Sequence, residues 1–209
     1  MRKKFIMAPG PTPIPAEVLV QAALPIIHHR TPGFQAIFKN CHEGLRYFFR
    51  TQNPVITFAS VGTGAMESAV ANLTSPGEKV LVASIGHFGN RWVEICKAYN
   101  VDVVHYEAEW GTALEPGEVK RQLASHPGVR LVFCTLNETS TGAVNKIEPI
   151  ARAAHEAGAL IVVDAISGLG AEPFETDAWG VDVVLSGSQK GFMLPPGLAF
   201  VALNAAARA

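Results

Sequence analysis

The stretch that decides the fold reads Val181-Asp182-Val183-Val184-Leu185-Ser186-Gly187-Ser188-Gln189-Lys190. Its apolar first half predicts a buried strand over residues 181–185, and its small polar second half places Lys190 at the exit of that strand. A lysine there is poorly solvated, so its pKa should fall and the neutral amine, the form that attacks carbonyls, becomes accessible. On this stretch alone, a surface lysine just past a strand end is an equally good interpretation.

A second strand that ends in a carboxylate favours the first interpretation. Residues 159–165 are apolar except for Asp164 near the end of the run. Burying a carboxylate is costly unless the group is paired. A lysine and an aspartate at the ends of neighbouring strands are what pyridoxal phosphate requires, because it needs an amine for a Schiff base and a partner for its pyridinium nitrogen.

The composition indicates one globular domain with small-molecule ligands. The chain has 209 residues, 48% of them hydrophobic and 17% charged, and a net charge of -1. The basic residues are scattered, so nucleic acid is a poor candidate as a partner. The sequence has no apolar run of about 18 residues that would span a membrane, and its start is too short and too soon broken for a signal peptide. We therefore expect a cytoplasmic protein.

The three cysteines do not form a recognisable pattern. They lie far apart and supply neither a disulfide framework nor a CxxC metal site. We expect each of them, Cys41, Cys96 and Cys134, to be a small buried apolar residue.

The N-terminal part differs from the rest of the chain. Residues 8–15 contain too many prolines and glycines for a helix or a central strand, and predict an extended arm that lies across another part of the molecule. Apolar residues at three- and four-residue spacing over residues 34–49 predict a helix with one apolar packing face. We expect residues 1–50 to form this arm and helix, and residues 51–209 to form the large, cofactor-binding domain.

From residue 54 onward, short β-rich runs alternate with helical patterns. Strands are predicted at residues 55–58, 79–83, 101–106, 131–135, 160–164, 181–185 and 198–203, and helices at residues 65–73, 90–99, 118–125 and 147–157. This alternation predicts an α/β fold, a three-layer αβα sandwich with a mostly parallel sheet. The last strand follows a short Pro-Pro-Gly connection, which favours antiparallel pairing. In such sheets, ligands bind beyond the carboxyl ends of the strands.

Two segments at that edge are candidate ligand contacts. Gly62-Thr63-Gly64 precedes a helix, so its backbone amides would face an anion such as phosphate. The alternative is a tight turn that needs glycine, and Glu67 stands where a dinucleotide fingerprint has its third glycine. Phe88 follows the next strand and is suited either to stacking on a heteroaromatic ring or to a place in the core.

Two polar clusters have less specific signals. Residues 137–142 follow the strand at 131–135 and offer hydroxyl groups, one of which would reach a phenolic oxygen; the alternative is a cap and turn cluster. His28-His29-Arg30 is either a site rim or a solvated turn, and without a third ligand at fixed spacing it does not predict a metal site.

Together these residues resemble the class V, fold-type I aminotransferases, especially the alanine–glyoxylate and serine–pyruvate (serine–glyoxylate) branch. The resemblance covers nearly the whole chain, and rests on residues 10–15, 29–34, 62–67, 89–91, 138–142, 163–167 and 186–190, followed by Pro195-Pro196-Gly197.

The resemblance implies a cofactor, a reaction and a set of contacts. Lys190 would form the Schiff base with pyridoxal 5'-phosphate and act as the base in transamination, and Asp164 would pair with the ring nitrogen. The other implied contacts are the phosphate at Gly62, Thr63, Gly64 and Gln189, the two ring faces at Phe88 and Ile166, and the ring hydroxyl at Thr139. The substrates would be a small amino acid and a keto acid, and the Gly10-Pro11 arm would approach them.

The chain departs from the family in one respect. Family members continue into a C-terminal domain that carries the arginine for the substrate carboxylate, and a second subunit completes the phosphate site. We therefore expect a fragment of a longer homodimeric protein, inactive as an isolated piece. A non-catalytic interaction module with the same fold is the alternative from another class, although a dead relative has no chemical need for both Asp164 and Lys190.

Other activities of the same fold remain as alternatives. Aminoethylphosphonate and ureidoglycine aminotransferases stay open, because the residues that separate them lie mostly in the absent part. Cysteine desulfurase is disfavoured, because that family has histidines where this chain has Gln189 and Phe88. Cys96 in a helix and Cys134 in a strand are also poor places for a reactive thiol.

Overall fold

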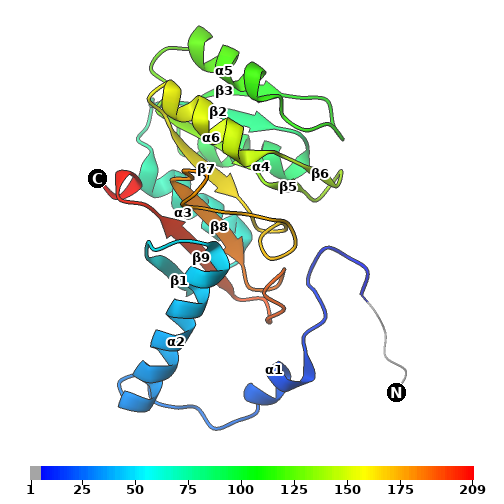
Figure 1. The fold of residues 1–209 in the computed structure, drawn as a ribbon, viewed down its shortest axis with the longest axis vertical. Helices are drawn as coiled ribbons and strands as arrows, with labels where there is room; N and C mark the ends of the chain where they lie inside the picture. The colour runs from blue at the N-terminus through cyan, green and yellow to red at the C-terminus, as the bar shows by residue number, and fades with distance from the viewer. Residues whose placement is uncertain (1–5) are drawn as a thin grey trace.

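Seven strands form one sheet in the computed structural model, which describes residues 6–209. Their order across the sheet is β1-β9-β8-β7-β4-β2-β3 (Figure 1). The strands are β1 Val55–Ala59, β2 Lys79–Ser84, β3 Asp102–Glu107, β4 Leu131–Thr135, β7 Leu160–Asp164, β8 Val183–Gly187 and β9 Leu198–Leu203. A short hairpin, β5 Asn137–Glu138 and β6 Ala143–Val144, lies outside the sheet.

The sheet is mostly parallel, as the sequence predicts. Neighbouring strands from β3 through β2, β4 and β7 to β8 are parallel, whereas β9 runs antiparallel to both β8 and β1. The antiparallel pairing predicted for the last strand is therefore confirmed. The strand order reverses between β2 and β4: β3 lies on the far side of β2, whereas β7 lies on the far side of β4. Such a reversal creates a ligand crevice at the carboxyl ends of the strands.

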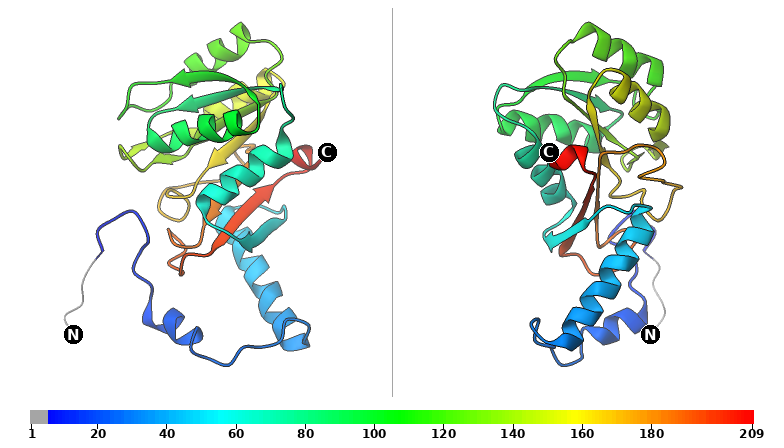
Figure 2. Two further views of the ribbon diagram at one scale, coloured as in Figure 1. Left: turned by 180° about the vertical axis from the view of Figure 1, so that it is seen from behind. Right: turned by 60° about the vertical axis from the view of Figure 1, so that its left-hand side comes forward.

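Helices cover both faces of the sheet and confirm the three-layer fold (Figure 2). Helices α3 Gly62–Leu73 and α4 His87–Ala98 lie on one face, and α5 Pro116–Ser125 and α6 Ile147–Glu156 lie on the other. Alternate strand residues supply the two cores: Val162 faces α3 and α4, whereas Ile161 and Val163 face the opposite layer. On the first face, the buried rings of Trp92 and Phe133 have centroids 4.7 Å apart.

The N-terminal helices lie outside this sandwich. Helix α1 Ala16–Gln21, which the sequence did not predict, has no buried residue, and α2 Pro32–Phe49 projects away from the sheet beside β1 and β9 (Figure 1). The expectation that α2 packs through its apolar face is wrong for most of its length: among the described residues only its last, Phe49, is buried, and Phe38 is 57% exposed. The division at residue 50 stays a prediction.

Two further expectations need correction. Strand β8 begins and ends two residues later than predicted. Asp182 uses its carboxylate to accept hydrogen bonds from the Ile161 amide (2.8 Å) and Asn204 Nδ2 (2.7 Å), and pairing with β9 continues to Gly187. Cys41 is exposed on the uncovered α2, whereas Cys96 and Cys134 are buried as expected. No helix between residues 6 and 209 is long and apolar enough to cross a membrane, and the cytoplasmic location stays a prediction.

Candidate active site

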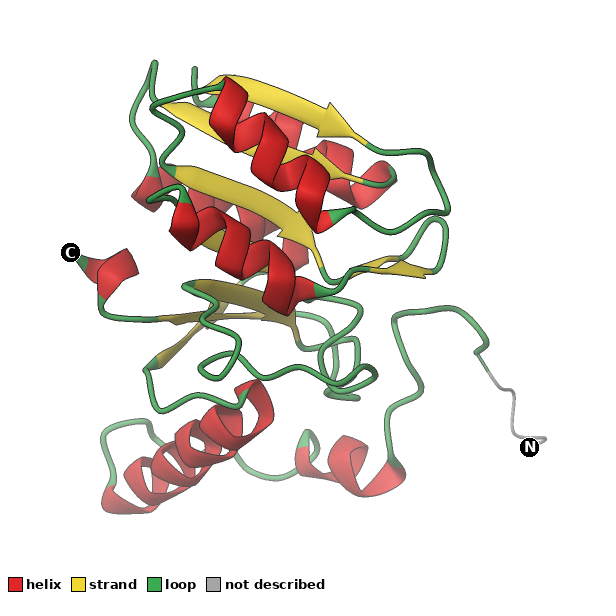
Figure 3. Cartoon of the chain, turned by 45° about the horizontal axis from the view of Figure 1, so that its top comes forward, coloured by secondary structure: helices red, strands yellow, loops and turns green. Residues whose placement is uncertain are grey.

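A cavity of about 170 Å³ lies at the carboxyl edge of the sheet. The arrowheads of the parallel strands point toward the side where the N-terminal segment lies (Figure 3). Eight of the nine residues that the sequence nominates as cofactor contacts line the cavity: Gly62, Thr63, Phe88, Thr139, Asp164, Ile166, Gln189 and Lys190. The ninth, Gly64, is at the third position of α3, where it packs against Ser60 outside the lining.

The first turn of α3 forms one wall. Val61, at the N-cap, has no polar side chain, so the amides of the first turn lack a capping acceptor there. These amides and the helix dipole favour an anion in the cavity. Gly62 is needed for this approach, because a Cβ added to it would lie 2.6 Å from Cδ1 of Ile166. The side chain of Ile166 therefore lies directly against the turn that opens α3.

Asp164 is the last residue of β7 and is 5% exposed. Its Oδ1 accepts a hydrogen bond from the amide of Ile166 at 2.8 Å. Desolvation raises the pKa of Asp164 to about 7, against the lowering effect of that hydrogen bond; the negative charge of Glu138 adds to the rise, and Lys190 and Arg91 oppose it. The site thus holds a buried carboxyl group whose ionised form needs a cationic partner.

Lys190 lies three residues beyond the end of β8 and is half-buried. Burial lowers its pKa, in the direction that the sequence predicts, and the charge of Asp164 partly opposes this shift. The two groups share one cavity without a salt bridge between them among the described residues. The lowered pKa of Lys190 makes its unprotonated amine, the form that attacks a carbonyl carbon, more accessible.

The N-terminal arm crosses the lysine loop. Thr12 donates from its amide to the carbonyl oxygen of Gln189 (3.0 Å) and from its hydroxyl to the carbonyl oxygen of Lys190 (3.0 Å). Gly10 has φ of +158°, and a Cβ added there would lie 2.9 Å from Cε of Lys190. The prediction that the arm lies across another part of the chain is confirmed.

The fold and the cavity agree with one known family. The profile described as Aminotransferase class-V matches residues 9–208. The chain belongs to the class-V aminotransferase family. Members of this family depend on pyridoxal phosphate.

Relatives of this class-V chain carry more than one name. It is 44% identical over 205 residues to the soluble hydrogenase small subunit of a Synechococcus strain, covering 97% of this chain and 53% of that protein. It is 41% identical over 204 residues to an L-aspartate–glyoxylate aminotransferase of Paracoccus denitrificans, and the match covers 95% of this chain and 52% of that protein. The structure of an alanine–glyoxylate aminotransferase from a Nostoc species superposes on this chain with a TM-score of 0.94 at 33% sequence identity. The match covers 100% of this chain and 55% of that one. The chain spans about half the length of the curated relatives it matches.

Three polar residues that line the cavity of the class-V chain, Arg91, Asn137 and Ser167, were not predicted as cofactor contacts from its sequence. Arg91 donates from Nη1 to the hydroxyl of Thr63 (2.9 Å), and its guanidinium carbon lies 5.1 Å from the ring centroid of Phe88. Ser167 donates to Oδ1 of Asn137 at 3.0 Å across the opposite wall. Phe88 and Arg91 are three residues apart on α4 and therefore share a face, but the helix predicted from the sequence began only at residue 90 and so did not include Phe88.

The histidine pair does not join the cavity. His28 and His29 are exposed, and their rings stack with centroids 4.7 Å apart. Among residues 6–209, no group of three or more histidine, cysteine, aspartate or glutamate side chains is arranged to hold a metal ion. The structure thus favours the solvated-turn interpretation of residues 28–30.

Proposed function

We propose that this chain carries the cofactor site of a pyridoxal-phosphate-dependent aminotransferase, which moves an amino group from a small amino acid, alanine or serine, to a keto acid, glyoxylate or pyruvate. One observation carries the proposal: a buried carboxyl, Asp164, and a half-buried amine, Lys190, face one cavity beside a helix N-terminus. The names of the Paracoccus and Nostoc relatives support glyoxylate as the acceptor, because both names include it.

The residues around the cavity fit this cofactor. Gln189 lines the cavity, and the NH₂ group of its side chain can donate a hydrogen bond to an anion that enters it. Thr63 and Gly64, with Gln189, would hold the phosphate. Asp164 would face the ring nitrogen, and the remaining contacts would be Phe88 and Ile166 on the ring faces and Thr139 at the ring hydroxyl.

When bound, pyridoxal phosphate supplies an electron sink for the charge left when an amino acid loses its α-proton. Lys190 has two tasks: its neutral amine is the nucleophile that holds the cofactor, and its Nζ atom is the base that accepts the α-proton and returns it. The lowered pKa of Lys190 suits both tasks, since each needs the unprotonated amine. Asp164 would keep a proton on the ring nitrogen of the bound cofactor, and this pairing would offset the cost of burying its charge.

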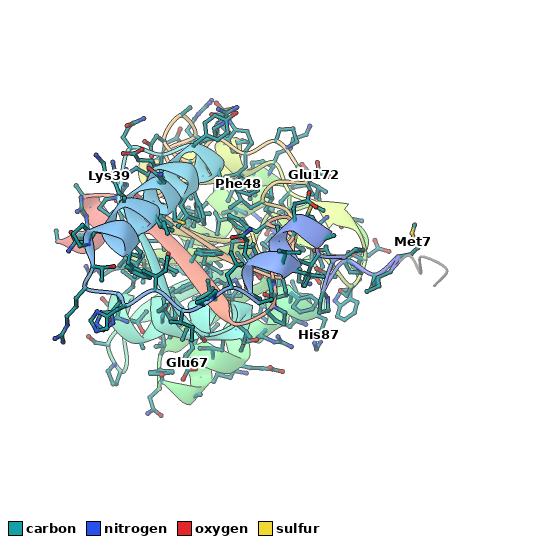
Figure 4. All side chains as sticks on the ribbon, turned by 90° about the horizontal axis from the view of Figure 1, so that it is seen from below. Met7, Lys39, Phe48, Glu67, His87 and Glu172 are labelled. Atoms are coloured by element: carbon teal, nitrogen blue, oxygen red, sulfur yellow. The ribbon has the colours of Figure 1, made fainter. Side chains whose placement is uncertain are left out.

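A homodimer is part of the proposal. Large apolar side chains stay exposed on the N-terminal segment, including Val20 at 56%, Ile37 at 50% and Phe38 at 57%. Beside α2, an apolar groove of about 590 Å³ runs past Phe48 and Phe192. Seen from below, Met7 extends beyond the body of the molecule (Figure 4). Apolar surface of this kind typically marks an interface, and a second copy of the chain would cover it.

The test is the visible absorption spectrum of the purified protein with added pyridoxal phosphate. We expect a band that Lys190→Ala abolishes and that Lys97→Ala, which replaces an exposed lysine at the end of α4, leaves unchanged. In the longer protein that the sequence analysis expects, addition of L-alanine or L-serine should bleach the band, whereas the 209-residue piece alone should form the band without bleaching. A protein without any band would overturn the proposal in favour of a non-catalytic module, and a band in the longer protein that no amino acid bleaches would overturn the substrate assignment.

A further inference from the structure

Glu138 is a fully buried carboxylate that the proposed reaction does not use. It lies in β5, directly before Thr139, and is 0% exposed. Its Oε2 accepts hydrogen bonds from the amides of Phe88 (3.0 Å) and Gly89 (2.9 Å). Its Oε1 accepts from the amide (3.1 Å) and the hydroxyl (2.7 Å) of Ser140.

These contacts make Glu138 the cap of a helix to which it does not belong. Phe88 and Gly89 occupy the first turn of α4, where amides lack partners within the helix, and Gly86 at the N-cap has no side chain to supply one. A Cβ added to Gly86 would lie 2.6 Å from Cγ of Glu138, so the glycine makes room for the carboxylate. A negative charge at this end of a helix is also stabilised by the helix dipole.

The capping carboxylate joins two walls of the cavity. Phe88, on α4, and Thr139, in the segment after β5, both line the cavity although they are 51 residues apart in the sequence. We propose that Glu138 is a positioning residue that fixes the ring-stacking Phe88 and the hydroxyl-bearing Thr139 relative to each other, and so sets the site for the pyridine ring. This inference rests on the proposed function, because the ring belongs to the cofactor.

The first experiment measures the affinity for pyridoxal phosphate in Glu138→Gln. An amide keeps the shape but presents an NH₂ group to the amide donors, so charge-assisted hydrogen bonds are lost. We expect the Kd to rise roughly 10-fold or more. The induced circular dichroism of the bound cofactor should fall as well, since the ring is held less firmly. Glu107→Gln is the matched control, because Glu107 is exposed and accepts a hydrogen bond from the side chain of Asn90 on the same helix (2.9 Å) rather than from the backbone amides of its first turn.

A double-mutant cycle separates positioning from general loosening. If Glu138 acts through Phe88, the Kd change caused by Glu138→Gln should shrink at least threefold in a Phe88→Ala background; equal changes in both backgrounds would overturn the inference. Should Glu138→Gln not fold, Glu138→Asp keeps the charge with a shorter reach and enters the same cycle. A wild-type protein that does not bind pyridoxal phosphate refutes the proposed function, whereas wild-type binding with an unchanged Kd in both Glu138 variants refutes only the positioning role.

Discussion

Asp164→Asn should change how the stability of the cofactor-free protein depends on pH. The carboxyl of Asp164 is 5% exposed, and burial raises its pKa from 3.8 to about 7. In the unfolded chain it releases its proton near pH 4, whereas the folded protein keeps the proton until about pH 7. Stability contributed by this group is therefore complete at low pH and is lost as the pH rises toward 7. An asparagine does not ionise, so the stability of the variant does not fall with pH through this position.

The magnitude follows from the two pKa values. A tenfold change in proton affinity corresponds to about 1.4 kcal/mol, so the interval from 3.8 to about 7 amounts to about 4 kcal/mol in full. Between about pH 5 and about pH 8, the wild-type protein should lose about 2.5 kcal/mol relative to the variant. The hydrogen bond from the Ile166 amide is kept in the variant, because the Asn side chain has an oxygen at the Oδ1 position.

The assay is denaturant unfolding of the cofactor-free protein and of Asp164→Asn across this pH range. Plotting the difference between the two free energies of unfolding removes the contribution of every other titrating group. The difference should grow with pH and level off above about pH 7. Asp102→Asn, at the exposed first residue of β3, is the control and should follow the wild-type curve. A difference that does not change with pH would refute the argument, since Asp164 would then be ionised in the folded protein.

Three further changes test the core, the arm and the interface. Trp92→Ala empties a fully buried site against Phe133 and should lower the free energy of unfolding by about 3–5 kcal/mol, measured by denaturant titration. Gly10→Ala strains a φ of +158° and crowds Lys190, so the Kd for pyridoxal phosphate should rise about tenfold in an absorbance titration. Phe38→Glu, at a side chain 57% exposed, should leave monomer stability within about 0.5 kcal/mol but convert the expected dimer to monomer in analytical ultracentrifugation.

The interior of the fold was predictable because its strands are apolar on both faces. The predicted strands at 131–135, 160–164 and 198–203 match β4, β7 and β9 at both ends. Strand β8 is displaced by two residues because Asp182 and the pairing with β9 set its ends, and both depend on residues distant in sequence. Helix α1 was missed, since its residues are all at least partly exposed and give no periodic signal.

Helix α2 shows that the spacing of apolar residues predicts a helix but not whether its apolar face is buried. Its spacing predicted a helix correctly, but spacing carries no information on what covers the face. The cysteines show the same difference. Cys41 lies on α2 and is exposed, whereas Cys134 lies in the central strand β4 and is buried. Burial predicted from the sequence thus held where the element lies inside the sandwich and failed where it projects.

The site shows the same division between local and distant information. Lys190 and Asp164 were found from their own strands, because the end of a buried strand is visible in the sequence. The contacts of Glu138 were not, because its hydrogen bonds join segments about 50 residues apart, and a glutamate in a polar cluster looks like a surface residue.

Burial and the nearby Glu138 together favour the protonated form of Asp164 in the cofactor-free pocket. Its pKa is raised first by desolvation and further by the charge of Glu138, so the cofactor-free pocket disfavours the ionised carboxylate. Glu138 accepts five hydrogen bonds, which hold the first turn of α4 and the segment that carries Ser140. A cationic hydrogen-bond donor placed against Asp164 would stabilise its ionised form, and under the proposed function the protonated ring nitrogen of pyridoxal phosphate would be that donor. The same burial that lowers the stability of the cofactor-free protein near neutral pH would therefore also favour binding of the proposed cofactor.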